Sequence, residues 1–155
     1  MRPAPVEIRL ARPEDLPAIV ALFADDAIGG HGDTTDPGTM PRYEAAFERI
    51  ASNPSDSLYV ATVAGVVAGT FQTTLITTLN GRGATTMRIE AVQTRSDLRG
   101  QGIGATMITF AVARAREAGA ATVHLTSNLR RTDAHRFYRR LGFVQSHAGF
   151  KLPLD

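Results

Sequence analysis

Two spacings of apolar residues along the chain predict a mixture of strands and helices. Positions 6–10 alternate apolar and charged residues, which is the period of a half-buried strand. Leu16, Ile19, Val20 and Phe23 have the spacing of one helical face, and Pro13 lies where a first helical turn accepts proline. The chain therefore opens with a strand followed by a helix.

A run rich in β-branched residues follows in the middle of the chain. Residues 57–63 and 66–79 flank Ala64-Gly65, and this pattern predicts two antiparallel strands joined by a tight turn. A turn at 80–83 and a third antiparallel strand at 84–92 come next. The many threonines of the second strand either reflect β propensity or line a polar cavity.

The remaining pattern completes an α/β chain. Residues 29–41 are rich in Gly, Pro, Thr and Asp, which predicts a long loop of the kind that often serves as a lid or binding loop. The other predicted elements are helices at 42–51, 102–118 and 132–140, a strand at 121–126, and closing strands at 143–146 and 150–152. The order β-α-α-β-β-β-α-β-α-β-β predicts a single domain over residues 1–155.

A glycine-rich turn, R-G-Q-G-I-G at 99–104, separates a predicted strand from the long helix at 102–118. Such a turn leaves backbone N–H groups unpaired at the positive end of a helix dipole, which suits a pyrophosphate. The turn lacks the Lys-Ser/Thr pair of a nucleotide P-loop. It also lies in mid-chain, after an antiparallel hairpin, unlike a dinucleotide fingerprint. The pattern therefore predicts a pyrophosphate held by backbone amides without a metal.

The composition mainly excludes certain kinds of chemistry and certain classes of protein. The 155 residues include no Cys, so disulfides and a cysteine nucleophile are excluded, and the four His have no metal-ligand spacing. The net charge is +2 and the pI about 9.5, but the arginines are spread along the chain, which does not favour a nucleic-acid surface. No apolar run approaches the roughly 20 residues of a membrane span, and no signal peptide is recognisable. We therefore expect a cytoplasmic protein with no membrane or nucleic-acid partner.

Tyr138 and Glu90 could each contribute acid–base chemistry. Tyr138 lies on the short helix, where it either packs as a core aromatic or donates a proton to a leaving thiolate. Glu90 lies on the strand that enters the glycine turn, and alternation places it on the face opposite Ile89 and Ala91. A carboxylate in the middle of a strand is costly if unpaired.

Two roles therefore stay open for Glu90. It either pairs with a cation such as Arg88 or Arg82, or it acts as a base toward an amine, directly or through a water.

Residues 87–152 resemble the GNAT superfamily of acyl-CoA-dependent N-acetyltransferases. The resemblance is carried by Ile89-Glu90-Ala91-Val92, Arg99-Gly100-Gln101-Gly102-Ile103-Gly104 and Phe137-Tyr138-Arg139-Arg140-Leu141-Gly142-Phe143. It implies a single-domain GNAT fold: a mixed, mostly antiparallel central sheet flanked by helices and splayed at the acyl-CoA site.

The resemblance also implies how the site works. Acetyl-CoA would be the co-substrate, no metal would be needed, and a neutral amine would attack the thioester directly. Glu90 would take the proton from the amine and Tyr138 would protonate the departing thiolate. A bulge near 90–92 would part this strand from the strand at 122–126. The cofactor would bind Val92, Gln93 and Thr94 through its pantetheine arm, and Arg99, Gly100, Gln101, Gly102, Ile103, Gly104 and Ala105 through its pyrophosphate.

One position departs from the family pattern. The asparagine that binds pantetheine in the family usually stands seven residues before the tyrosine, and Arg131 occupies that position in this chain. Asn128 stands ten residues before Tyr138. Either Asn128 reaches the cofactor, or Arg131 approaches the 3′-phosphate of coenzyme A.

Residues 125–147 resemble the aminoalkylphosphonate N-acetyltransferase branch. This implies a small primary amine as acceptor, with arginine as a partner for any anionic group that it carries. Three alternatives are an acetyltransferase of protein N-termini or lysines, a non-catalytic acyl-CoA-binding module, and a nucleic-acid binder. A homodimer is an expectation from the family.

Overall fold

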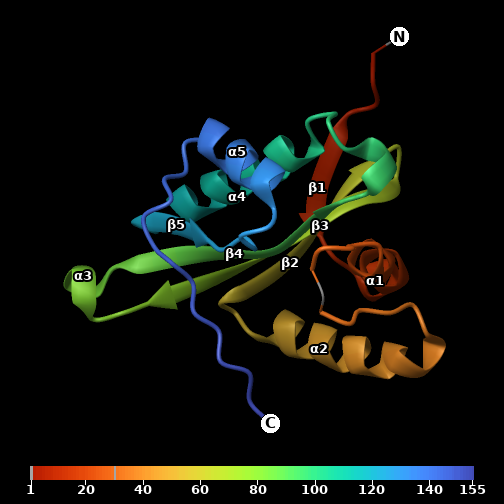
Figure 1. Ribbon diagram of the computed structural model, residues 1–155, viewed down its shortest axis with the longest axis horizontal. Helices are drawn as coiled ribbons and strands as arrows, with labels where there is room; N and C mark the ends of the chain where they lie inside the picture. Colours follow the sequence, from red (N-terminus) through yellow and green to blue (C-terminus); the bar gives the residue numbers. More distant parts are fainter. Residues whose placement is uncertain (1, 30) are drawn as a thin grey trace. The chain divides into compact units, whose positions relative to one another are not determined.

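The computed structural model describes residues 2–29 and 31–155 (Figure 1). The chain divides into two compact units, Met1–Leu125 and Thr126–Asp155, called the N-terminal and the C-terminal unit below. Each is described by itself. The single domain expected over residues 1–155 stays a prediction.

The N-terminal unit contains a five-stranded sheet. Its strands lie in the sequence order β1-β2-β3-β4-β5, and every neighbouring pair is antiparallel except β4 and β5, which are parallel. This confirms the predicted mixed, mostly antiparallel sheet. The strands are β1 (Val6–Leu10), β2 (Asp56–Val63), β3 (Val66–Thr77), β4 (Thr85–Thr94) and β5 (Thr122–Leu125).

Three longer helices cover the two faces of this sheet. Helices α1 (Leu16–Ala24) and α2 (Met40–Ser52) pack together on one face, and α4 (Ile103–Glu117) packs on the other (Figure 1). On the α4 face, Tyr59 stacks on Phe71 with ring centroids 4.9 Å apart, and the edge of Phe110 meets Tyr59 at 5.2 Å. Short 3-10 turns precede these helices at Pro13–Asp15, Pro37–Thr39 and Ser96–Leu98.

Several predicted bounds move by a few residues. The loop predicted at 29–41, of which residue 30 lies outside the described residues, ends earlier than predicted, because the 3-10 turn begins at Pro37 and α2 at Met40, with Pro41 in its first turn. The predicted turn at 80–83 is present as α3 (Asn80–Gly83), in which Gly81 and Arg82 have left-handed backbone angles.

The threonines of strand β3 fit a role in the sheet better than the lining of a polar cavity. Thr70 Oγ1 donates to the Tyr59 carbonyl at 2.8 Å, and Thr74 Oγ1 donates to Asp56 Oδ1 at 2.7 Å. Both bonds join β3 to β2.

The C-terminal unit contains one helix, α5 (Thr132–Arg140), at the predicted bounds. Gly142, with φ of 95°, follows it in the left-handed conformation that commonly ends a helix. The strands predicted at 143–146 and 150–152 were wrong, since neither range is a strand. Their apolar side chains, such as Val144 and Phe150, are exposed, so their alternation has no partner surface to pack against.

Candidate functional site

A β-bulge interrupts β4 shortly after its pairing with β5 ends at Ile89. Glu90 pairs with Gln72 and Gln93 pairs with Thr70, so Ala91 and the residue after it share a single partner position on β3. Ala91 has φ of 52° and is exposed, whereas Ile89 is buried. The prediction that Ile89 and Ala91 share a face was therefore wrong, because the extra residue shifts the alternation.

The pairing of β4 with β5 is short. It runs from Thr86 opposite Thr122 to Ile89 opposite Leu125 and goes no further. From Glu90 to Thr94, β4 has no strand partner on its β5 side within the described residues. The interruption expected near 90–92 is present, and it leaves an open strand edge that includes Val92 and Gln93.

The glycine turn follows this edge after the 3-10 turn at Ser96–Leu98. Within the described chain, none of the seven amides of residues 99–105 donates a hydrogen bond, while Thr106 N–H begins the helical ladder by donating to the Gly102 carbonyl. Gly100 and Gly102 have φ of 76° and 84°, and a Cβ on either would meet no atom within 4 Å. Seven open amides at the start of α4 form a site suited to an anion, as predicted for this turn. The seven residues are Arg99, Gly100, Gln101, Gly102, Ile103, Gly104 and Ala105.

Glu90 lies at the beginning of the open edge. Its Oε1 is 3.5 Å from Arg88 Nε, and each of the two side chains is about half exposed, at 48% and 50%. The pairing with Arg88 considered from the sequence is therefore present, and at this distance and exposure it is a weak one. The carboxylate remains accessible to an incoming group.

Tyr138 belongs to an aromatic cluster in the C-terminal unit. Its ring lies 5.1 Å from that of Phe137 and meets the edge of Phe143 at 5.8 Å. Burial raises the pKa of the phenol, and the charge of Arg131 acts in the opposite direction. The phenol is therefore protonated at neutral pH, which is the form that can donate a proton.

Asn128 organises the segment before α5. Its Oδ1 accepts from the Arg130 N–H at 2.9 Å, and its carbonyl accepts from the Arg131 N–H and from the His135 Nε2, each at 2.9 Å. Both oxygens of Asn128 are thus used within the unit. Arg131 is the residue immediately before the first turn of α5.

Sequence reasoning missed Ser127. Its hydroxyl oxygen is buried and has no hydrogen-bond partner in the described structure. A serine in a loop carries no signal that would have identified it.

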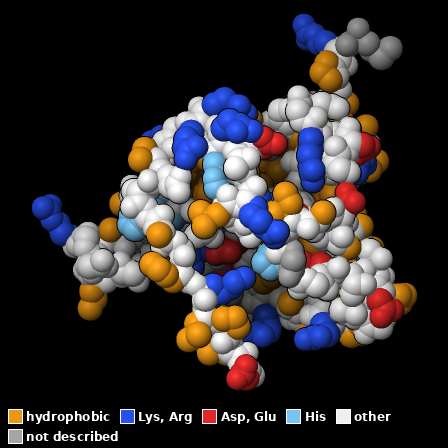
Figure 2. All heavy atoms as spheres, in the orientation of Figure 1, with side chains coloured by type: hydrophobic (Ala, Val, Ile, Leu, Met, Phe, Trp, Pro, Cys, Tyr) orange, Lys and Arg blue, Asp and Glu red, His pale blue; other side chains and the backbone are white. Residues whose placement is uncertain are grey.

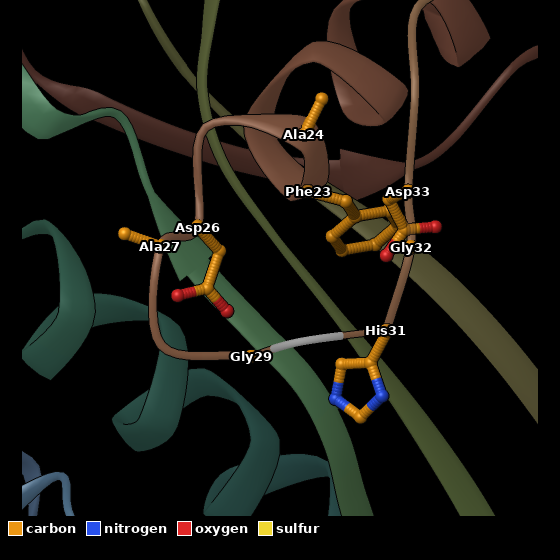
Figure 3. A pocket seen from close by; sticks show the side chains of 8 residues that line it. All are labelled: Phe23, Ala24, Asp26, Ala27, Gly29, His31, Gly32 and Asp33. Atoms are coloured by element: carbon orange, nitrogen blue, oxygen red, sulfur yellow. The ribbon is translucent and has the colours of Figure 1, made fainter.

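Described residues of the loop after α1 line a hollow of about 220 Å³ (Figure 3). Tyr43 of α2 holds this loop, because its hydroxyl donates to Asp33 Oδ1 at 2.7 Å and accepts from the Thr34 N–H at 3.3 Å. Asp26 lies against Gly29, so a side chain added at Gly29 would collide with its carboxylate. The hollow is lined by Phe23, Ala24, Asp26, Ala27, Gly29, His31, Gly32 and Asp33.

The described residues were also compared with what a metal site, a membrane span or a basic surface band requires. Among them, no group of three or more His, Asp or Glu side chains is arranged to hold a metal ion. None of the described helices is both long enough and apolar enough to cross a membrane. On the face drawn in Figure 2, basic side chains lie among neutral and acidic ones and do not form one continuous band.

Two features of the N-terminal unit fit an acyl-CoA. The open amides of 99–105 suit its diphosphate, and the unpaired edge from Glu90 to Thr94 suits the amide-bearing pantetheine arm. Each feature is a set of main-chain groups left available for hydrogen bonding.

Comparisons with known proteins agree with this fit. The model of the acetyltransferase (GNAT) family matches residues 17–143. An aminoalkylphosphonate N-acetyltransferase of Salmonella typhimurium is 49% identical over 57 residues, which make up 37% of this chain and 37% of that protein. The match therefore spans little more than a third of the curated relative.

Solved structures extend the likeness to the whole chain. A transcriptional regulator from Bacillus halodurans C-125 has a TM-score of 0.93 and 36% identity, covering 97% of this chain and 100% of that one. AAC(6′)-Iy, solved in complex with the bisubstrate analogue CoA-S-monomethyl-acetylneamine, has a TM-score of 0.78 over 98% of this chain and 99% of its own; its 15% identity supports the fold alone. Because the family model covers most of the chain and the fold agrees, this chain belongs to the acetyltransferase (GNAT) family.

Proposed function

We propose that this protein is an acetyl-CoA-dependent N-acetyltransferase that acts on a primary amine of a small molecule. The observation that carries the proposal is the row of seven open amides at 99–105, which follows the unpaired edge of β4 after the short 3-10 turn at Ser96–Leu98. A main-chain cradle for a diphosphate followed by a strand edge for an amide-bearing arm matches the two halves of coenzyme A. Family membership supports the same cofactor.

The groups of the chain then have distinct roles. When bound, acetyl-CoA supplies an acetyl thioester. The amides of 99–105 hold the diphosphate, and the backbone of Val92, Gln93 and Thr94 pairs with the pantetheine arm. These contacts fix the position of the thioester carbon relative to the amine, which is the main benefit of binding both substrates together.

Two proton transfers accompany the reaction. The amine nitrogen bonds to the acetyl carbon while the carbon–sulfur bond breaks, so the nitrogen loses one proton and the sulfur gains one. Glu90 accepts the proton from the nitrogen, directly or through a water, and its exposure leaves it accessible to do so. Tyr138 donates a proton to the sulfur, and its raised pKa keeps that proton in place at neutral pH.

A small acceptor is favoured by two observations. The matching segment of the Salmonella typhimurium relative belongs to a protein named for an aminoalkylphosphonate substrate. The loop after α1 is fixed to α2 by the hydrogen bond from Tyr43 to Asp33 and lines a small hollow, which suits a small molecule better than a long peptide. Helix α1 itself packs on β3 and β4.

The test is a release assay for free thiol from acetyl-CoA with a panel of small amines, including aminoalkylphosphonates. Matched alkylphosphonates without the amine serve as controls. We expect thiol release only with the amines. Release only with peptide N-termini or lysines would instead identify a protein acetyltransferase. Binding of acetyl-CoA without release on any amine would identify a non-catalytic acyl-CoA-binding module.

The name of the Bacillus halodurans relative raises nucleic-acid binding as an alternative to the proposal. The C-terminal unit also carries six basic residues against two acidic ones. Binding of duplex DNA that persists near 150 mM salt and weakens steeply above it would support this candidate. We propose no nucleic-acid partner and a cytoplasmic location, and we expect no such binding.

A further inference from the structure

Gln72 of β3 lies directly opposite Glu90 in the β3–β4 ladder. Residues paired in this way point to the same face of a sheet, and their Cβ atoms are about 4.5–5.5 Å apart. The preceding residue, Phe71, meets Phe110 of α4, with ring centroids 6.3 Å apart. Alternation along β3 therefore directs Gln72, and Glu90 with it, to the other face of the sheet, on which α1 and α2 pack (Figure 1).

The side-chain amide of Gln72 is available for hydrogen bonding. It is half-buried and forms no hydrogen bond with another described residue. Thr70 and Thr74, its neighbours on the same face of β3, both use their hydroxyls in bonds to β2. The carboxylate of Glu90 makes only the exposed 3.5 Å contact with Arg88. An unused amide and an accessible carboxylate therefore lie side by side on this face.

A primary amine can use both groups while it is acetylated. As its nitrogen bonds to the acetyl carbon, one N–H bond breaks and Glu90 takes the proton, directly or through a water. The carbon–sulfur bond breaks, and the sulfur takes a proton from Tyr138. The second N–H stays on the nitrogen and is present in the product amide. It becomes a stronger donor as the nitrogen gains positive charge, and the carbonyl of a glutamine side chain can accept from it.

We propose that Gln72 selects primary amines, because its Oε1 accepts the N–H that the acceptor nitrogen keeps. This inference rests on the proposed function, since it assumes that Glu90 receives the other proton. A secondary amine has one N–H, which is lost to Glu90, so it leaves Gln72 without a partner. Leu58, which pairs with Gln72 on the β2 side, offers no hydrogen-bonding side chain in its place.

The test is the steady-state kinetics of Gln72→Met with two acceptors. They are the primary amine with the fastest thiol release and its N-methyl derivative, for example aminomethylphosphonate and N-methylaminomethylphosphonate. We expect kcat/KM for the primary amine to fall about 3- to 10-fold, the usual loss for one neutral hydrogen bond, and kcat/KM for the methylated amine to stay unchanged. Where the methylated amine is not turned over, its inhibition constant should stay unchanged.

Gln72→Val is a second variant, since a β-branched apolar residue suits a strand and cannot accept a hydrogen bond. It should reduce the preference for the primary amine by a similar factor. The melting temperature of both variants should stay close to that of the wild type, because the amide of Gln72 makes no bond within the described protein.

Thr74→Val is the matched control. It removes one polar group from the same face of the same strand, at a hydroxyl that donates to Asp56 Oδ1 at 2.7 Å. It should lower the melting temperature slightly and leave the preference for the primary amine unchanged. A similar loss of preference in this control would show that the effect is not specific to Gln72.

Two results would overturn the inference: an unchanged kcat/KM for the primary amine in both Gln72 variants, or equal falls for the two amines. Equal falls with a lower melting temperature would show a structural role. If the wild type releases thiol with no amine, the proposed function itself fails and takes this inference with it. If the wild type acetylates the primary amine and the Gln72 variants keep its full preference, only this inference fails.

Discussion

Gly102 combines two properties at the start of α4. Its φ of 84° is a backbone angle that L side chains rarely adopt, and the space where a Cβ would stand is open. The first property shapes the turn so that the amides of 99–105 stay unpaired. The second leaves room for a ligand to approach those amides directly.

We therefore predict that Gly102→Val abolishes binding of coenzyme A in a calorimetric titration, because the new side chain occupies the space above the cradle. Gly65→Val is the matched control, since Gly65 has φ of 78°, an equally open Cβ position and a place in the β2–β3 turn. Both variants should lose similar stability, and only Gly102→Val should lose the ligand. Retained affinity in Gly102→Val would remove the cradle from the account.

Tyr138 packs as an aromatic residue and retains a phenol that can act as an acid. Tyr138→Phe keeps the ring contacts with Phe137 and Phe143, so we expect turnover to fall about 10²-fold or more with little change in affinity for coenzyme A. Because burial raises the pKa, any loss of rate caused by ionisation of Tyr138 should appear only above pH ~10. Steady-state kinetics across pH check both points, and a Phe variant with wild-type turnover would exclude the acid role.

Glu90 forms a weak ion pair and also has a proposed catalytic role, and two substitutions can separate the two. Its 3.5 Å contact with Arg88 is exposed, so Glu90→Gln should leave the melting temperature nearly unchanged while lowering kcat about 10²-fold. Arg88→Gln removes the same ion pair from the other side and should keep most of the activity. Equal losses of kcat in the two variants would instead assign the effect to the pair.

At the scale of elements, Asp15 joins β1 by hydrogen bonds to the 3-10 turn that precedes α1. Both its oxygens accept from the Arg9 guanidinium, at 2.7 and 3.0 Å, and Oδ2 also accepts from the Arg12 N–H at 2.7 Å. The hydrogen bonds from Arg9 lower the pKa of Asp15 below its usual value, against the opposing effect of burial. The bonded carboxylate is thus favoured over the protonated acid in the folded state.

A lowered folded-state pKa fixes the sign of the pH dependence. The stabilisation from Asp15 is present above its unfolded pKa of about 3.9 and is lost as the pH falls through the lower, folded value. We expect Asp15→Asn to lower the free energy of unfolding by about 1–3 kcal/mol at pH 7 and by less near pH 3. Urea unfolding at both pH values measures this.

Asp97→Asn provides the comparison for that measurement. It breaks an exposed pair, in which Asp97 Oδ1 lies 2.6 Å from Arg95 Nε, and it should change stability little. An Asp15→Asn destabilisation of the same size at pH 7 and pH 3 would contradict the linkage.

Elements with local signals were predictable from the sequence. The helix at α5 lies at its predicted bounds, between a polar loop and Gly142, and the β2–β3 hairpin is centred on Ala64-Gly65 as expected. The closing strands failed because a strand is defined by its partner, and alternation at Phe150 and Leu152 cannot show whether one is present. Local pattern predicts the capacity to form a strand, but pairing decides whether it forms.

The candidate site likewise has features that could be predicted from the sequence and features that could not. The cradle at 99–105 was predictable because glycines at a strand–helix junction act through their own backbone. The face of Ala91 was not, because the bulge inserts a residue and shifts the phase of β4. The buried hydroxyl of Ser127 was not predictable either, because the burial of one serine side chain has no sequence signature.

At the scale of the whole molecule, the end of the chain exposes an unusual amount of apolar surface. Phe150, Leu152 and Leu154 alternate along a segment without secondary structure, and they are 97%, 83% and 88% exposed. Val144 is 82% exposed. Exposed apolar residues that lie close together in a segment commonly mark an interaction surface, so we propose that this segment contributes to the homodimer expected from the family.

We predict that light scattering during gel filtration will give a dimer for the wild type and a monomer for a Phe150→Asp, Leu152→Asp variant. Leu79→Asp is the control, because Leu79 is equally exposed, at 97%, but lies beside the α3 turn in the N-terminal unit. It should leave the dimer intact. A monomeric wild type at tens of micromolar would contradict the proposal.

The central claim is that main-chain amides at the start of α4 hold the diphosphate of coenzyme A. The most direct measurement is a crystal structure of the protein with coenzyme A bound. We expect diphosphate oxygens about 2.7–3.2 Å from amide nitrogens of 99–105, with the pantetheine arm along the edge from Glu90 to Thr94. A diphosphate bound elsewhere on the molecule, or coenzyme A absent at saturating concentration, would contradict the account.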